Sequence, residues 1–249
     1  MRYKLTVEYD GTKYHGWQKQ KNARTVQEEL ETALLKLGIQ TVTTASGRTD
    51  SGVHAKGQVV HFDGDVKIPL SSLPFAINAY LPEDIAVVKC ERAADDFNAR
   101  FDAKQKTYCY RLYVSRLRHP LFENNHYHVT GDIDLDKMKK AAKVIEGEHD
   151  FKCFEASGST VTDTVRTVYE IKIETKKFID CFEVEIYVTG NGFLYNMVRI
   201  IAGTLLYVGQ GKFSVSDVEN ILKNKDRTAA GKTLPAKGLT LEEVVYERS

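Results

Sequence analysis

The order of two hydrophobic spacings in the first hundred residues constrains the fold of this chain most. Residues 3–9 alternate apolar and polar side chains, which is the period of a half-buried strand. Residues 26–37 carry apolar side chains at helical spacing and are followed by Gly38. Further segments predict strands near 41–44 and 59–62, a helix over 73–80 and a strand over 85–88. The predicted order is β-α-β-β-α-β.

The start of the first helix carries a recognisable signal. Thr25 is followed three residues later by Glu28, just before the apolar positions begin. A hydroxyl and a carboxylate at this spacing form a capping box, in which each side chain accepts a hydrogen bond from a backbone N–H at the helix start. We therefore expect Thr25 to cap the helix through its side chain.

The second half repeats this order, although no motif is repeated in the letters themselves. The spacing predicts a strand over 108–114, a helix over 135–145 capped by Asp134, a hairpin over 165–188, helices over 194–208 and 214–222, and a closing strand over 241–246. We expect an α+β protein of two tandem ferredoxin-like (βαββαβ) domains, residues 1–104 and 105–249. Each antiparallel sheet would carry its helices on one face.

The free face of such a sheet is a known RNA-binding surface, as in the RNA-recognition (RRM-like) module. Neither half carries the aromatic signature of that module, so the sequence does not indicate that bases stack on the sheet face.

Composition places the chain among soluble globular proteins, with 42% hydrophobic and 28% charged residues. No apolar run reaches the length of a membrane span, and the N-terminus lacks a signal-peptide core, so we expect a cytoplasmic protein without a membrane partner. The four widely separated cysteines show no metal-binding spacing and are expected to be buried thiols.

The net charge of +1 gives no support to a nucleic-acid partner, but its distribution is uneven. One basic cluster comprises Lys13, Lys19, Lys21 and Arg24, and a second comprises Arg100, Lys104, Lys106, Arg111, Arg116 and Arg118. Such clusters either follow a phosphate backbone or are solvated surface segments, and the sequence leaves both open.

Residues 46–58 form a glycine-bracketed loop between two predicted strands. The loop places Arg48 two residues before Asp50, between Gly47 and Gly52. Glycines allow close approach of a ligand to the backbone, and reacting groups tend to lie on loops of a rigid scaffold. The loop is therefore either a catalytic segment or a polar turn.

A metal site is the rival interpretation of the same region. His54, His61, Asp63 and Asp65, together with Asp50, would make the chain a metal-dependent phosphoesterase. The two histidines are seven residues apart across a loop and a strand, and Asp63-Gly64-Asp65 is typical of a turn. We therefore disfavour a metal site.

Several spaced motifs occur in a fixed order along the chain. They are Tyr9-Asp10-Gly11 with Gly16-Trp17-Gln18, Gly47-Arg48-Thr49-Asp50-Ser51-Gly52-Val53-His54-Ala55, Phe97-Asn98-Ala99-Arg100-Phe101, Lys106-Thr107-Tyr108-Cys109-Tyr110, Gly147-Glu148-His149-Asp150-Phe151, Gly192-Phe193-Leu194-Tyr195-Asn196-Met197-Val198-Arg199 and Pro235-Ala236-Lys237-Gly238-Leu239. With them the chain resembles the tRNA pseudouridine synthase A family along essentially its whole length. Only Thr233-Leu234, before the last motif, departs mildly from the family's pattern.

The resemblance implies an isomerase that converts uridine to pseudouridine at positions 38, 39 and 40 in the anticodon stem-loop of tRNA. It implies no cofactor and no metal, and a homodimer that clasps tRNA. The family's catalytic aspartate corresponds to Asp50, its base-stacking tyrosine to Tyr108 and its motif arginines to Arg48 and Arg199. The second domain is expected to complete the active-site cleft.

The chemistry explains why such groups are needed. The base must leave the stack before its glycosidic bond is reached, and Arg48 is expected to fill the vacated space or hold a flanking phosphate. Asp50 would attack C1′ of the sugar, add to C6 of the base or take the C2′ proton, and Arg199 would keep it ionised. Tyr108 would stack on the freed uracil. The alternative is a non-catalytic RNA-binding protein on the same scaffold.

Overall fold

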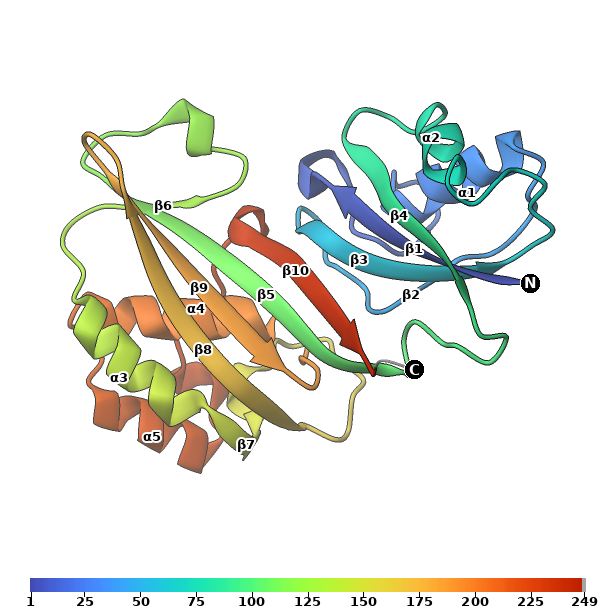
Figure 1. Ribbon diagram of the computed structural model, residues 1–249. Helices are drawn as coiled ribbons and strands as arrows, with labels where there is room; N and C mark the ends of the chain where they lie inside the picture. The colour runs from blue at the N-terminus through green and yellow to red at the C-terminus, as the bar shows by residue number, and fades with distance from the viewer. Residues whose placement is uncertain (248–249) are drawn as a thin grey trace. The chain divides into compact units, whose positions relative to one another are not determined.

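The computed structural model describes residues 1–247, and these form two compact units (Figure 1). The first unit comprises residues 1–104 together with the C-terminal segment from Thr240, and the second comprises residues 105–239. Within the described residues, no helix combines the length and hydrophobicity needed to cross a membrane.

The first unit is built on three long strands. β1 (Arg2–Tyr9) lies between β3 (His54–Asp63) and β4 (Ile85–Ala93) and is antiparallel to both. The remaining elements are the short β2 (Thr44–Ala45), antiparallel to β3, and the helices α1 (Val26–Lys36) and α2 (Leu73–Asn78). The alternation predicted for β1 is present, because Tyr3, Leu5, Val7 and Tyr9 are all buried.

The last strand differs from the expected arrangement. The sequence placed residues 241–246 in the second domain, but β10 (Leu239–Tyr246) pairs in parallel with β3, through Thr240 opposite His54 and Leu241 opposite Ala55. It contacts the first unit by side chains as well, since the Tyr246 hydroxyl donates to the Ala99 carbonyl (2.6 Å). Alternation identifies a strand but not its partner, which is why the sequence could not locate it.

The capping box predicted for α1 is wrong. Thr25 is the N-cap residue, but its side chain makes no capping bond, and its hydroxyl is buried without a protein partner among the described residues. Backbone carbonyls take its place: the N–H of Val26 donates to the Gly16 carbonyl and that of Gln27 to the Trp17 carbonyl. The helix start is thus tied to the loop that precedes it.

The second unit is a four-stranded antiparallel sheet with three helices (Figure 1). Its strand order is β5–β9–β8–β7, and β6 adds in parallel to β5. The elements are β5 (Ala103–Val114), β6 (Tyr127–Val129), α3 (Leu135–Ile145), β7 (Gly147–Asp150), β8 (Val165–Lys177), β9 (Phe182–Gly190), α4 (Met197–Gly209) and α5 (Val215–Asn224). α3 packs against α4, α5 and β8.

Two helices of this unit start where the sequence predicts, and a third starts later than predicted. The Asp134 carboxylate accepts from the Lys137 N–H at the start of α3, and Ser214 and Asp217 form a capping box at the start of α5. α4 begins at Met197 instead of Leu194, because Asn196 adopts a left-handed conformation (φ 60°) that separates the helix from the preceding turn. The mixed α+β class is confirmed.

Candidate active site

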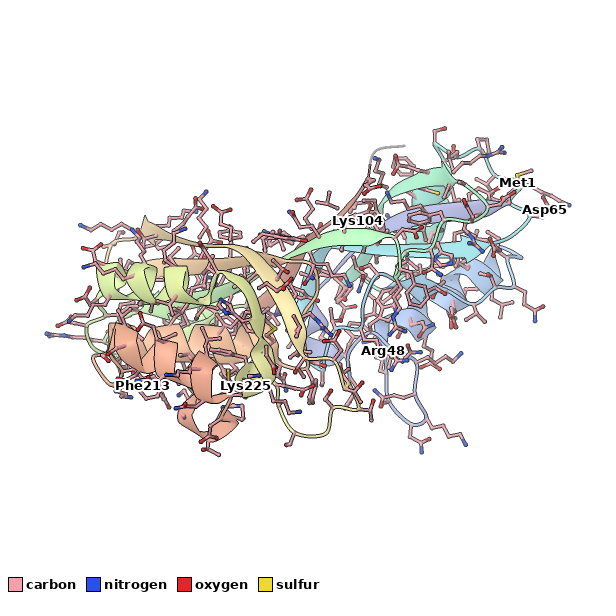
Figure 2. All side chains as sticks on the ribbon, turned by 90° about the horizontal axis from the view of Figure 1, so that it is seen from below. Met1, Arg48, Asp65, Lys104, Phe213 and Lys225 are labelled. Atoms are coloured by element: carbon pink, nitrogen blue, oxygen red, sulfur yellow. The ribbon has the colours of Figure 1, made fainter. Side chains whose placement is uncertain are left out.

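The glycine-bracketed loop predicted from the sequence connects β2 to β3 in the first unit. Side chains along it differ in exposure: Ser46 and Thr49 are buried, Asp50 is half-buried, and Arg48, which is labelled in Figure 2, is exposed. The arginine and the aspartate therefore belong to the accessible part of the loop. The buried residues beside them anchor it.

A second loop, residues 10–17, holds this segment through its backbone. The Trp17 N–H donates to the Thr49 carbonyl (3.0 Å), and the Gly52 N–H donates to the Tyr14 carbonyl (3.2 Å). The two bonds flank Asp50 on either side. Because the Tyr14 and Trp17 side chains are themselves buried, the loop that carries Asp50 is fixed to the core of its unit.

Two glycines permit this close packing. A Cβ on Gly11 would lie 2.0 Å from the Val53 carbonyl oxygen, and one on Gly16 would lie 2.5 Å from the Thr49 carbonyl oxygen. Gly16 also has a φ of +85°, which favours glycine. The Gly11 and Gly16-Trp17 motifs thus act together with the Asp50 loop, although they are more than 30 residues away in sequence.

His54 and Asp10 lie at the edge of the same loop. His54 is buried, and its Nδ1 accepts from the Gly11 N–H (3.0 Å) with an Asp10 carboxylate oxygen 3.1 Å away. Burial raises the pKa of Asp10. The hydrogen bonds that its carboxylate accepts from Thr12, together with the proximity of His54, outweigh this effect and hold the pKa below its ordinary value. This nitrogen of His54 therefore has a structural partner.

The rival metal site is not assembled. The Nδ1 of His61 accepts from the Ala99 N–H (3.1 Å), and Asp63 pairs with Arg2 (2.7 Å). Within residues 1–247, the group of potential ligands close enough to hold a metal is His119, Asp180 and Cys181 in the second unit. There the Ser115 hydroxyl lies 3.1 Å from the His119 Nε2, so this nitrogen of the group has a hydrogen-bonding partner.

The second unit carries the predicted stacking tyrosine. Tyr108 is a half-buried residue of β5. Its ring packs edge to face against that of Phe193, with the ring centroids 5.4 Å apart. Tyr110 shares its face of the strand but is buried, and its hydroxyl donates to the Pro235 carbonyl (2.7 Å). Burial raises the pKa of Tyr110. Of the two phenols, Tyr108 is the accessible one.

Arg199 lies in the first turn of α4 and is held in place. Its Nε donates to the Leu234 carbonyl (2.6 Å) and its Nη1 to the Asn196 side chain (2.6 Å). Tyr108 and Arg199 thus belong to the second unit, and Arg48 and Asp50 to one loop of the first.

The first basic cluster is partly neutralised. Arg24 pairs with Glu29 (2.6 Å) and lies over the Tyr14 ring, and Lys19 lies 3.7 Å from Glu31. Both basic residues therefore have a structural role besides any contact with phosphates.

A hollow of about 1050 Å³ opens in the second unit, where the hairpin of β8 and β9 turns. Leu117 and Ile179 line it and are 71% and 104% exposed, and Leu121, which follows Leu117 in the chain, is 94% exposed. Charged residues of both signs border it, namely Arg116, Asp132, Lys177 and Asp180. Large apolar side chains exposed together in this way are typical of interaction surfaces.

The structure adds residues to which the sequence assigned no role in the site. Tyr9, Trp17 and Gln58 are all buried and contact the Asp50 loop or its immediate surroundings. Their place within or next to the ordered motifs was the only signal, and it did not indicate what they contact.

Comparison with known proteins identifies the family to which the chain is similar. A family model described as tRNA pseudouridine synthase matches residues 5–102 and 141–247. Proteins named tRNA pseudouridine synthase A are similar along the full length. The one from Thermoanaerobacter is 48% identical (97% of this chain, 98% of the relative), that from Ruminiclostridium cellulolyticum 48% (98% and 99%) and that from Bacillus licheniformis 49% (99% and 100%).

Among solved structures, the chain is similar to one in the crystal structure of an archaeal box H/ACA sRNP Nop10-Cbf5 complex. The sequence identity is 14% and the TM-score 0.36, over 91% of this chain and 59% of that one. This likeness is too weak to bear on function.

Proposed function

Since the chain belongs to the tRNA pseudouridine synthase family, we propose that it isomerises uridine to pseudouridine at positions 38, 39 and 40 of the tRNA anticodon stem-loop, with Asp50 as the catalytic nucleophile. The observation that carries this proposal is the accessible Asp50 on a loop held by backbone hydrogen bonds on both sides. A rigidly held carboxylate is what a nucleophile needs, because small misplacements are costly in rate.

The reaction breaks the bond between N1 and C1′ of uridine and forms one between C5 and C1′. C5 loses a proton and N1 gains one, so the product has the same composition as the substrate. As a carboxylate, Asp50 forms a bond to C1′ of the sugar or to C6 of the base, and this bond breaks once C5 has bonded to C1′. The chain needs no oxidant or second substrate for this exchange.

The other predicted site residues fit supporting roles. Arg48 is exposed beside Asp50, which suits contact with the phosphate next to a flipped nucleotide or with the space that the base leaves. The accessible ring of Tyr108 suits stacking on uracil, a contact worth about 1–3 kcal/mol per base. The role proposed for Arg199, keeping Asp50 ionised, rests on the family resemblance; within its own unit the guanidinium is held by the Leu234 carbonyl and the Asn196 side chain.

We also infer a ferredoxin-like arrangement for the units. In the first unit the order β1-α1-β2-β3-α2-β4, with the strands β4–β1–β3 and β2 along β3, supports it. The second unit offers the corresponding order β5–β9–β8 with α3 and α4.

We propose that the protein acts in the cytoplasm as a homodimer. The exposed Leu117, Leu121 and Ile179 support self-association. The charges of both signs around the hollow in the second unit do so as well, because a two-fold interface must be complementary to itself.

The test is to incubate the purified, chelator-treated protein with an unmodified tRNA transcript and to map pseudouridine in the product. We expect pseudouridine at the three positions, lost in Asp50→Asn and Asp50→Ala while tRNA binding is retained. An active Asp50→Ala protein would contradict the role of Asp50. Tight binding without product from the wild type would favour the RNA-binding alternative.

A further inference from the structure

Gln58 is completely buried beneath the Asp50 loop and is bonded to it by both ends of its amide. Its Nε2 donates to the Gly47 carbonyl (2.9 Å), and its Oε1 accepts from the Ser46 hydroxyl (2.7 Å). Gln58 itself belongs to β3, a central strand of the first unit. The amide thus links the start of the loop to the sheet.

A second buried contact holds the loop on the other side of Arg48. The Tyr9 hydroxyl of β1 and the Thr49 hydroxyl are 2.7 Å apart, and the side chains of Tyr9 and Gln58 also interact. Both contacts therefore belong to one polar network that joins two strands to the loop. Buried networks whose members are all paired fix a unique geometry.

The network acts on the backbone that presents the site residues. The Gly47 carbonyl is bonded to Gln58, and the Thr49 hydroxyl to Tyr9. The residues on both sides of Arg48 are therefore fixed to the strands of the sheet. Arg48 and Asp50 are left as the more accessible side chains of that segment. The loop that carries Asp50 is thereby held from the core, in addition to the bonds from residues 10–17.

We propose that Gln58 is a positioning residue for the isomerisation, which sets the orientation of Arg48 and Asp50 through Gly47 and Ser46 without touching the substrate. This inference rests on the proposed function. An amide suits the position because it supplies one donor and one acceptor without charge, and an ionised side chain is costly to bury.

The decisive variant is Gln58→Met, which has similar size but makes neither hydrogen bond. We expect its single-turnover rate at saturating enzyme to fall about 100-fold, the effect of a roughly 1 Å misplacement, with little change in the Kd for tRNA. The control for the loss of two amide hydrogen bonds is Asn78→Leu, at an exposed position. Asn78 also bonds a backbone carbonyl and N–H of the first unit, both from Val87, away from the loop. We expect this control to keep the wild-type rate.

Gln58→Glu provides a rescue by protonation, read in the single-turnover rate at an unchanged Kd for tRNA, because a merely structural loss would weaken binding as well. A protonated carboxyl reproduces the donor and the acceptor of the amide, whereas a carboxylate cannot donate to Gly47. Its rate relative to wild type should therefore rise as the pH falls. Two phenols lie at the network: Tyr9 interacts with Gln58, and Tyr246 with Ser46. Burial raises the pKa of Tyr9 to about 12 and that of Tyr246 as well, so neither phenol titrates near neutral pH.

The outcomes separate the two proposals. If wild type forms no pseudouridine, the proposed function fails. If wild type is active but Gln58→Met matches Asn78→Leu in rate, the positioning role is wrong. If Gln58→Met does not fold, the pH dependence of Gln58→Glu decides: a constant ratio to wild type between pH 6 and 9 overturns the inference, and a ratio that rises toward low pH supports it.

Discussion

The backbone conformation of Gly16 affects the position of the loop that carries Asp50. Its φ of +85° lies in the region that L-residues rarely adopt, and its missing Cβ leaves space for the Thr49 carbonyl. Its own carbonyl accepts from the Val26 N–H at the start of α1. One residue thus joins a helix and the Asp50 loop.

We expect Gly16→Ala to destabilise the first unit and to slow the isomerisation. Gly38→Ala is the control, because Gly38 has a similar φ of +80° but a methyl group there would meet no neighbouring side chain or backbone atom within 4 Å. The control should lose about 1–2 kcal/mol from conformation alone and keep its activity. Denaturant unfolding and single-turnover rates measure both effects. Equal losses of stability and rate in the two variants would contradict the role of the Thr49 contact.

The sequence singled out the residues that we propose to carry the chemistry, but not their supports. Arg48 and Asp50 stand out because charged residues between glycines in a short loop are recognisable without coordinates. Gln58 and Tyr9 do not, because each acts through a partner on another segment, and spacing along the chain does not report such contacts. The Thr25 capping box failed for the same reason: carbonyls of Gly16 and Trp17 compete for the helix start.

At the scale of elements, the segment between β5 and α3 packs through histidines onto the sheet of the second unit. The His128 ring stacks on that of Tyr113 with centroids 4.6 Å apart, and the His126 Nε2 lies 2.6 Å from a Glu183 carboxylate oxygen. His126 is buried, and Arg111 lies near the same carboxylate at 4.0 Å. The attachment of β6 therefore depends on a titratable group.

This arrangement predicts a stability that depends on pH. Burial, opposed in part by Glu183, lowers the pKa of His126 below its ordinary value of 6.5. The unfolded chain therefore binds a proton at His126 more readily than the folded chain does. The contribution of neutral His126 to the free energy of unfolding is present above pH 6.5 and is lost as the pH falls toward the pKa of His126 in the folded state. Melting temperatures of wild type and His126→Gln between about pH 7.5 and 5 test this. The variant should lack the part of the decline that is due to His126, and parallel curves would contradict the prediction.

Helices and strands whose apolar residues are regularly spaced were predictable from the sequence. Short strands that exist only because a neighbouring strand pairs with them were not. β1, α3 and α5 follow from alternation, helical periodicity and cap residues. The two-residue β2 and the three-residue β6 are strands because β3 and β5 lie beside them, and such short segments have no periodicity of their own.

At the scale of the whole molecule, the exposed apolar residues of the second unit predict the oligomeric state. We expect Ile179→Asp to shift the protein from dimer to monomer in light scattering coupled to gel filtration, because a charge is costly to bury at an interface. Val42→Asp, a change at an exposed valine of the first unit, is the control and should remain dimeric. A dimeric Ile179→Asp protein would exclude this surface, and a monomeric wild type would exclude the homodimer.

The parallel pairing of β10 with β3 has a consequence for synthesis. β10 is the last strand of the described chain, yet it completes the sheet of the unit that begins at the N-terminus. On the ribosome, the edge of β3 at His54 and Ala55, next to the Asp50 loop, stays uncovered until the whole second unit has been made. The unit that is translated first is therefore finished last, and its exposed edge is the part of the nascent chain most open to wrong pairing.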